Sequence, residues 1–252
     1  MIFEPLFCEF MMRLRQPFAF LICLLTLSLS VTAQVQFSGW LGSFNTFKLN
    51  NRFSLHFDGQ LRSTDQLQQV SAVLLRPGLN FHLNKTWVLT GGYMLNLNRR
   101  TNSGISALLG EHRAWQQVQA NYKLGKVAVA HRFRFEERFI PRPKVEGNEL
   151  KTDGYDQAFR FRYFIRNIFP LVSGTGFSEG PFLALQNEIF LNTGNKTAVN
   201  GKAFDQNRLY GAVGYRLKGK FDLEAGYMNQ YISTRTAIIN NHIVQLALYK
   251  RL

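Results

Sequence analysis

RFRFEERF, from Arg132 to Phe139, alternates charged residues with phenylalanine, and FRFRYFIR, from Phe159 to Arg166, repeats its pattern. In a helix, residues two apart lie on nearly opposite faces, because each residue turns the helix by about 100°. In a strand, residues two apart share a face. The alternation therefore predicts two strands, each with a phenylalanine-rich face. The opposite face of the first strand would carry Arg132, Arg134, Glu136 and Arg138.

The same period of two recurs along most of the chain. Further alternating rows occupy residues 52–62, 73–83, 87–97, 114–124, 183–191, 209–217, 221–231 and 244–248. A weaker segment, 35–49, carries Trp40, Phe44 and Phe47 but alternates poorly. No amphipathic helix is indicated in this part of the chain. The rows are about ten residues long, the length that a tilted strand needs to cross a bilayer. We therefore expect an all-β chain that forms a single antiparallel transmembrane β-barrel.

The number of strands follows less directly from the pattern. The segments number eleven, but bacterial single-chain barrels have an even number of strands. We therefore expect ten strands, with 35–49 outside the wall, or twelve, with an extra strand in 168–179. Tight turns are indicated at Asn84-Lys85, at Gly125 and at Lys218-Gly219-Lys220, and longer polar loops at 99–110, 141–154, 193–203 and 232–241. Short periplasmic turns alternating with longer extracellular loops are typical of outer-membrane barrels.

Alternation alone does not say whether the apolar face meets lipid or a dry core, since a soluble barrel such as a lipocalin has the same period. Aromatic residues at both ends of several rows, such as Phe221 and Tyr231, favour lipid with an aromatic girdle at each interface. An arginine at mid-bilayer would cost about 2–4 kcal/mol. We therefore place the phenylalanines against lipid and the arginines in the lumen. A soluble periplasmic ligand carrier is the alternative.

Residues 1–33 have the pattern of a secretory signal peptide. Arg13 and Arg15 precede a short apolar run, and Val31-Thr32-Ala33 provides small residues for cleavage after Ala33. Residues 1–10 look like an upstream extension, because Met11 or Met12 would begin a more ordinary signal. The barrel domain would then be 34–252, in the outer membrane of a Gram-negative bacterium.

The composition limits the chemistry of the exported chain. Both cysteines, Cys8 and Cys23, lie in the predicted signal peptide, so no thiol or disulfide would remain. The formal net charge is +14, but export removes nucleic acid as a partner. The positive charge suits lipopolysaccharide phosphates and small anionic solutes. An outer-membrane barrel would also contact membrane lipids and the barrel-assembly machinery.

The charged residues on the polar parity form the candidate site. The predicted lumen-facing network consists of Arg113, Arg132, Arg134, Glu136, Arg138, Asp156, Arg160, Arg162, Glu188, Arg208, Arg216 and Glu224. One interpretation is a narrow anion-favouring channel or a binding barrel. The other is a structural barrel, in which the ions pair with one another and fill the bore.

An enzyme is the alternative from a different class. Outer-membrane acyl hydrolases and transferases use a histidine with a serine and an acidic or amide partner, and Glu111-His112 or Asn241-His242 could supply part of such a site. No serine lies in a recognisable nucleophile setting, so we predict no catalytic residue, cofactor or metal site. His131 lies on the apolar parity, which suggests a position near a membrane interface.

Several ordered blocks resemble a known family. They are EHRAWQQ (111–117), HRFRFEERF (131–139), FRFRYFIR (159–166), NEIFLN (187–192), FDQNRLYGAVGYRL (204–217), GYMNQY (226–231) and NHIVQLAL (241–248). On these blocks the chain is similar to the exported family called domain of unknown function 2490. The resemblance implies an outer-membrane β-barrel of Gram-negative bacteria, often of the Bacteroidetes type, and it implies no activity.

Overall fold

The structure is a computed structural model that describes residues 33–172, 177–218 and 220–251. The predicted signal peptide and its upstream extension, apart from Ala33, lie outside the described residues. The described residues contain no helix long and apolar enough to span a membrane.

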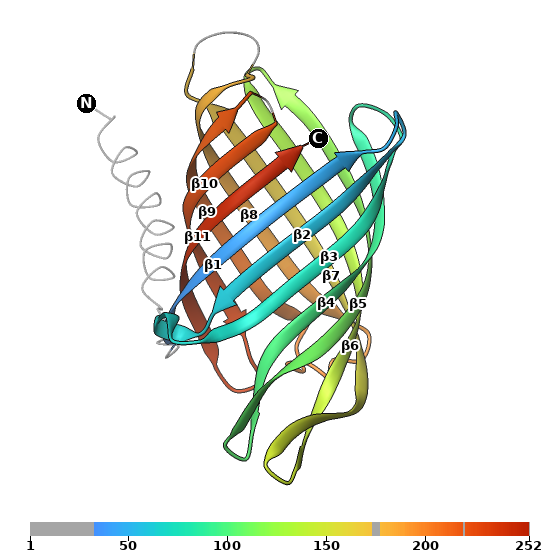
Figure 1. Cartoon of the computed structure of the whole chain (residues 1–252), viewed down its shortest axis with the longest axis vertical. Helices are drawn as coiled ribbons and strands as arrows, with labels where there is room; N and C mark the ends of the chain where they lie inside the picture. The colour runs from blue at the N-terminus through green and yellow to red at the C-terminus, as the bar shows by residue number, and fades with distance from the viewer. Residues whose placement is uncertain (1–32, 173–176, 219, 252) are drawn as a thin grey trace, which may run out of the picture. The chain divides into compact units, whose positions relative to one another are not determined.

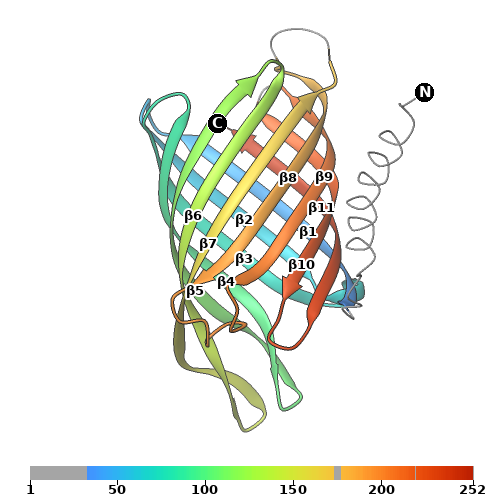
Figure 2. The ribbon, with the colours of Figure 1, turned by 180° about the vertical axis from the view of Figure 1, so that it is seen from behind.

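Eleven described strands close into one barrel (Figure 1). Each strand pairs antiparallel with the next along the chain, and the opposite side of the wall continues the same order (Figure 2). A short 3₁₀ helix, η1 (Asp65–Leu67), follows β2. The strands are β1 (Ala33–Lys48), β2 (Phe53–Ser63), β3 (Val70–His82), β4 (Trp87–Asn102), β5 (Ile105–Leu124), β6 (Val127–Glu146), β7 (Glu149–Pro170), β8 (Gly180–Thr193), β9 (Phe204–Leu217), β10 (Phe221–Ser233) and β11 (Ile238–Arg251).

The prediction of ten or twelve strands is wrong, because the weak segment 35–49 does join the wall as β1. An odd number of up-and-down strands closes only through one parallel pair. Here β1 runs parallel to β11, from Ala33 opposite Ile238 to Thr46 opposite Arg251. The segment alternates poorly because it carries aromatic residues on both faces, including Trp40 in the lumen. In the described part of 168–179 there is no further strand.

Two of the predicted long loops are wrong as well. The segments 99–110 and 141–154 continue as strands and form hairpins that project beyond the wall, at the lower end of Figure 1. Their turns are two residues long, and Gly104 and Gly147 have the positive φ that such turns require. A hairpin that projects beyond the barrel wall needs no apolar face, so its strands can be polar. For this reason these two segments resembled loops in the sequence.

The other connections are closer to expectation. A loop is present at 194–203, but the connection predicted at 232–241 shrinks to 234–237. The expected tight turns occur at 83–86 and 125–126, at the end of the barrel opposite the hairpins. Between β9 and β10, Lys220 N donates to Leu217 O at 3.0 Å, as a tight turn requires, and Gly219 lies outside the described residues.

Side chains alternate across the wall. Phe133 is 53% exposed on the outside, whereas its neighbour Arg134 is fully buried inside. The same division holds around the barrel, with leucine, tyrosine and phenylalanine outside and charged or amide side chains inside. The interior also holds two apolar clusters, one around Phe182 and Tyr210 and one around Met94 and Trp115. The candidate site lies in the charged part of this interior.

Candidate functional site

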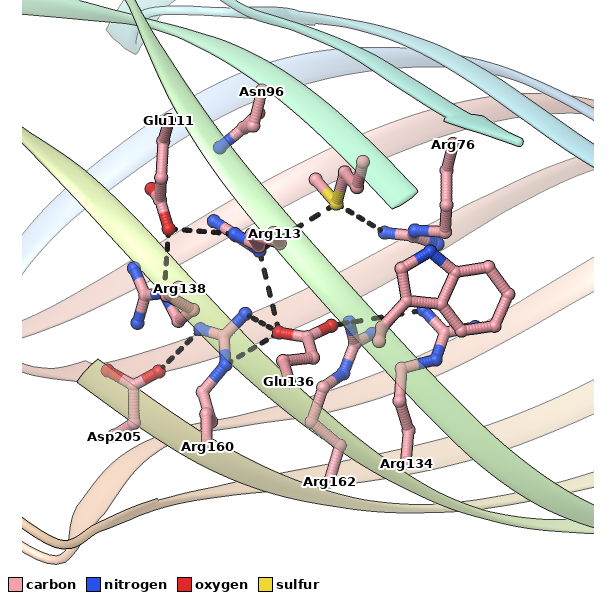
Figure 3. A network of polar contacts seen from close by, with 12 residues as sticks. Arg76, Asn96, Glu111, Arg113, Arg134, Glu136, Arg138, Arg160, Arg162 and Asp205 are labelled. Atoms are coloured by element: carbon pink, nitrogen blue, oxygen red, sulfur yellow. Dashed lines mark hydrogen bonds and ion pairs between the residues drawn. The ribbon is translucent and has the colours of Figure 1, made fainter. Parts of the chain in front are cut away.

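Glu136, on β6, is the centre of an ion network in the barrel interior (Figure 3). Its carboxylate lies 2.6 Å from Arg160 Nη2 and 2.5 Å from Arg162 Nη1. Arg113 and Arg134 approach more loosely, at 3.6 and 3.9 Å. Register explains the convergence, because Glu136 faces Arg160 across the β6–β7 pair and same-face residues lie two positions away.

Two further carboxylates extend this network. Each holds two arginines at 2.7–2.8 Å: Glu111 holds Arg113 and Arg138, and Glu188 holds Arg132 and Arg162. Because Arg113 and Arg162 also approach Glu136, the three carboxylates share their partners. Burying a single unpaired charge is costly. The mutual pairing of carboxylates and guanidinium groups offsets that cost in the interior.

Aromatic rings hold several of the same guanidinium groups. A cation over an aromatic face gains about 0.5–2 kcal/mol, depending on how far it is desolvated. Close cases in this region are Arg62 over Trp40 at 3.8 Å, Arg132 over Phe164 at 4.1 Å, Arg134 over Trp115 at 4.4 Å and Arg162 over Phe190 at 4.4 Å. These rings fix the cations in position without cancelling their charge.

An uncharged hydrogen-bond chain joins the network on the wall formed by β2 to β6. The bonds, in order, are Asn80 Nδ2 to Ser54 Oγ (3.0 Å), Thr90 Oγ1 to Asn80 Oδ1 (2.7 Å), Gln117 Nε2 to Thr90 Oγ1 (3.2 Å), and Arg134 Nη2 to Gln117 Oε1 (2.7 Å). Ser54 Oγ also lies 2.8 Å from His82 Nε2. The chain therefore runs from Arg134 to His82.

The histidines proposed for an enzyme lie elsewhere. His112 bonds the hydroxyls of Tyr93 and Tyr155 on the outer face, whereas Glu111 points into the lumen. These two neighbours therefore do not form a catalytic pair. His242 likewise bonds a tyrosine, Tyr227. Among the described residues, no three His, Cys, Asp or Glu side chains are grouped to hold a metal ion.

His131 is flanked by two tyrosines. Its ring nitrogens lie 2.9 Å from Tyr122 Oη and 2.8 Å from Tyr163 Oη. The three side chains share the outer face of the wall.

Most of the twelve predicted network residues lie in the interior, and nine are buried. The structure brings seven of them together with Glu136 or its partners: Arg113, Arg132, Arg134, Arg138, Arg160, Arg162 and Glu188. Asp156 is separate, because it is half exposed and pairs with Arg142 on the projecting hairpin at 3.3 Å. Arg216 pairs with Asp222 near the opposite end at 2.8 Å, and Glu224 pairs with Arg166.

The sequence-based set missed several residues of the site. Arg62 and Arg76 stand on the polar parity of β2 and β3, so the same pattern could have identified them. Asp205 has the parity of the outward-facing residues of β9, and it lies at a shift in the β8–β9 register that the alternation does not reveal. Asp205 accepts a bond from Arg160 Nη1 at 2.8 Å. Trp40 gave a weaker signal, as an aromatic residue in a row that alternates poorly.

Two cavities occupy the lumen. The larger, about 1010 Å³, lies toward the projecting hairpins, and the smaller, about 470 Å³, lies toward the short turns. Eleven arginines and four carboxylates line the larger cavity. Its arginines are Arg62, Arg76, Arg99, Arg100, Arg113, Arg138, Arg142, Arg160, Arg162, Arg208 and Arg235. Asp58, Glu136 and Glu188 do not line the cavity, but they pair with its arginines Arg76, Arg160 and Arg162. Eleven arginines therefore meet seven carboxylates, and the cavity keeps an excess of positive charge.

Comparison with known proteins gives three similarities. An uncharacterized protein of Methylorubrum extorquens is 29% identical over 203 residues, which cover 76% of this chain and 78% of that protein. A solved structure described as the NanC porin in a rhombohedral crystal form aligns with a TM-score of 0.46 and 9% identity, covering 80% of this chain and 89% of that one. Residues 37–241 match a family described as protein of unknown function (DUF2490). The chain therefore belongs to the DUF2490 family.

Proposed function

We propose that this chain is an outer-membrane β-barrel whose arginine-lined interior binds small anionic solutes or lets them pass. The short turns would face the periplasm, and the projecting hairpins would face outward. The apolar outer wall supports a membrane location, since large side chains such as Phe133, Phe161 and Leu246 are 46–53% exposed there. A soluble protein rarely leaves so continuous an apolar surface in water.

The observation that carries the proposal is the charge of the larger cavity. Eleven arginines line it and no lysine does, and they outnumber the seven carboxylates that line it or pair with those arginines. Arginine keeps its charge at any physiological pH. Cationic groups in a confined, low-dielectric space concentrate anions, and rings of them line anion pores. A structural plug of paired ions explains the contacts around Glu136, but it does not require this excess.

The size of the two cavities also supports a solute. Small-molecule sites are typically about 300–1,000 Å³, and the cavities here are about 1010 and 470 Å³. The smaller cavity lies toward the short turns and the larger cavity toward the hairpins. Together the two cavities extend along the lumen from one end of the barrel toward the other.

Planar-bilayer recording tests this function. With a potassium chloride gradient across the membrane, we expect a reversal potential of the sign that chloride permeation gives. Heat-modifiable migration of protein from the membrane fraction would establish insertion and separate this proposal from a soluble carrier. Cation selectivity would contradict the proposal, and so would an inserted barrel that neither conducts nor binds anions.

A further inference from the structure

The two lumen cavities share part of their lining. Five residues line both cavities: Trp40, Arg62, Arg76, Arg162 and Arg208. A solute that moves from one cavity to the other passes these residues. The four arginines among them therefore influence which solutes this part of the lumen recognises.

Two of the four arginines already have carboxylate partners. Arg76 Nη1 lies 2.9 Å from Asp58 Oδ2. Arg162 bonds Glu136 at 2.5 Å and Glu188 at 2.8 Å. These arginines are neutralised by the protein and serve as framework.

The other two arginines, Arg62 and Arg208, differ from them. In the part of the chain that the structure describes, neither has a carboxylate oxygen within 4.0 Å. Each donates one side-chain hydrogen bond to a neutral amide, Arg62 to Gln60 at 2.7 Å and Arg208 to Gln206 at 3.3 Å. The Nε atoms of both arginines are buried without a hydrogen-bond partner. Arg76 Nε is also without a partner, so the missing carboxylate is what sets Arg62 and Arg208 apart. A buried cation without a counter-charge is costly unless a ligand supplies one.

Aromatic rings hold both unpaired guanidinium groups at the lumen. The Cζ atoms of Arg62 and Arg208 lie 3.8 and 4.9 Å from the centre of the Trp40 ring. Arg208 is also 4.7 Å from the Phe190 ring. The rings orient the two cations but carry no formal negative charge, so the positive charge remains available to a solute.

We infer that Arg62 and Arg208, held by Trp40, form a binding site for the oxyanion group of a small solute, a carboxylate or a phosphate. The inference rests on the proposed function and names its binding site. The planar guanidinium fork matches two oxygens of such a group, whereas chloride offers only one acceptor. The site would therefore prefer oxyanions to halides, beyond the general attraction of the cavity for anions.

Titration of the detergent-solubilised barrel in sodium chloride tests the site. Inorganic phosphate and acetate serve as probes, and calorimetry or the tryptophan fluorescence measures binding. We expect saturable binding of at least one probe in the presence of chloride. Arg62→Gln and Arg208→Gln should each weaken it about tenfold or more, because each removes a charge-assisted contact. Arg99→Gln is the matched control, since Arg99 lines only the larger cavity and its Nε already donates to Val70 O at 2.8 Å.

A second pair of variants keeps both arginines. Gln60→Glu and Gln206→Glu place a carboxylate where Arg62 and Arg208 now meet an amide, with almost no change in shape. Each variant should lose about tenfold or more in affinity for the probe, because an internal partner occupies one arginine. Heat-modifiable migration would verify that the variants fold.

The outcomes separate this inference from the proposed function. Binding that is absent in the parent barrel, or unchanged in both the Gln and the Glu variants, overturns the site. Anion selectivity in the bilayer measurement would then still support the proposed function. Conversely, a barrel that binds phosphate through Arg62 and Arg208 but does not conduct is a binding barrel with the site intact.

Discussion

Glu136 and Arg160 face each other across the β6–β7 pair, and Glu136 Oε2 lies 2.6 Å from Arg160 Nη2 and 3.1 Å from its Nε. The two residues belong to the two alternating motifs, RFRFEERF and FRFRYFIR. The repetition in the sequence therefore corresponds to two adjacent strands that place complementary charges inside and aromatic rings outside.

Replacing Glu136 with glutamine should destabilise the barrel strongly. The change leaves Arg160 and Arg162 without the carboxylate that both contact most closely. Removing one member of a buried ion pair typically costs about 3–5 kcal/mol. Urea unfolding of the barrel in lipid vesicles should show a midpoint clearly below that of the parent.

Glu137→Gln is the control, because Glu137 stands one residue further on, on the outer face, and bonds Gln157. If both variants unfolded at the same urea concentration, the network around Glu136 would not be a source of stability.

Replacing Phe133 with arginine tests the position of the outer wall. Phe133 is 53% exposed. If that face lies in hydrocarbon, an arginine there should cost about 2–4 kcal/mol and reduce folding into vesicles. Thr152→Arg adds the same side chain on the projecting hairpin, where water should accept it without loss. For a soluble barrel, by contrast, Phe133→Arg would be neutral and would improve solubility.

The alternating pattern was sufficient to assign the fold class and the direction of most side chains. It did not provide the strand number, because closure depends on whether β1 meets β11, and these strands are far apart in the sequence. Parity also selected most of the central arginines. The alternation could not show which arginines have a carboxylate partner, because such contacts depend on residues far apart in the sequence. Arg208 on β9, for example, contacts Trp40 on β1 across the lumen.

The parallel contact between β1 and β11 can be tested by cross-linking. Leu41 and Leu246 are register partners, and both are exposed on the outer face. With Cys8 and Cys23 replaced by serine, the pair Leu41→Cys and Leu246→Cys should join efficiently with a short thiol cross-linker. Migration on a denaturing gel would report the product.

The control pair is Leu41→Cys with Val244→Cys, which is two residues out of register on the same face. It should react less. Equal yields from the two pairs, or no product from either, would show that β1 does not close the wall in this register.

Gln117 connects the charged network to the uncharged chain, so its loss should affect both. Its Oε1 accepts bonds from Nε and Nη2 of Arg134 at 3.0 and 2.7 Å, and its Nε2 donates to Thr90. Arg134 is fully buried, and its nearest carboxylate oxygen, on Glu136, is 3.9 Å away. Gln117→Ala would leave this guanidinium without its main acceptor, at a cost of about 1–3 kcal/mol or more.

Gln117→Glu should be tolerated far better than Gln117→Ala, because it keeps the acceptor and gives Arg134 a carboxylate partner at nearly the same place. Gln116→Ala is the control for side-chain loss on β5, since Gln116 faces outward and is exposed. Urea midpoints should therefore fall only for Gln117→Ala. A similar fall for Gln117→Glu would mean that a buried carboxylate here costs more to desolvate than its pairing with Arg134 returns.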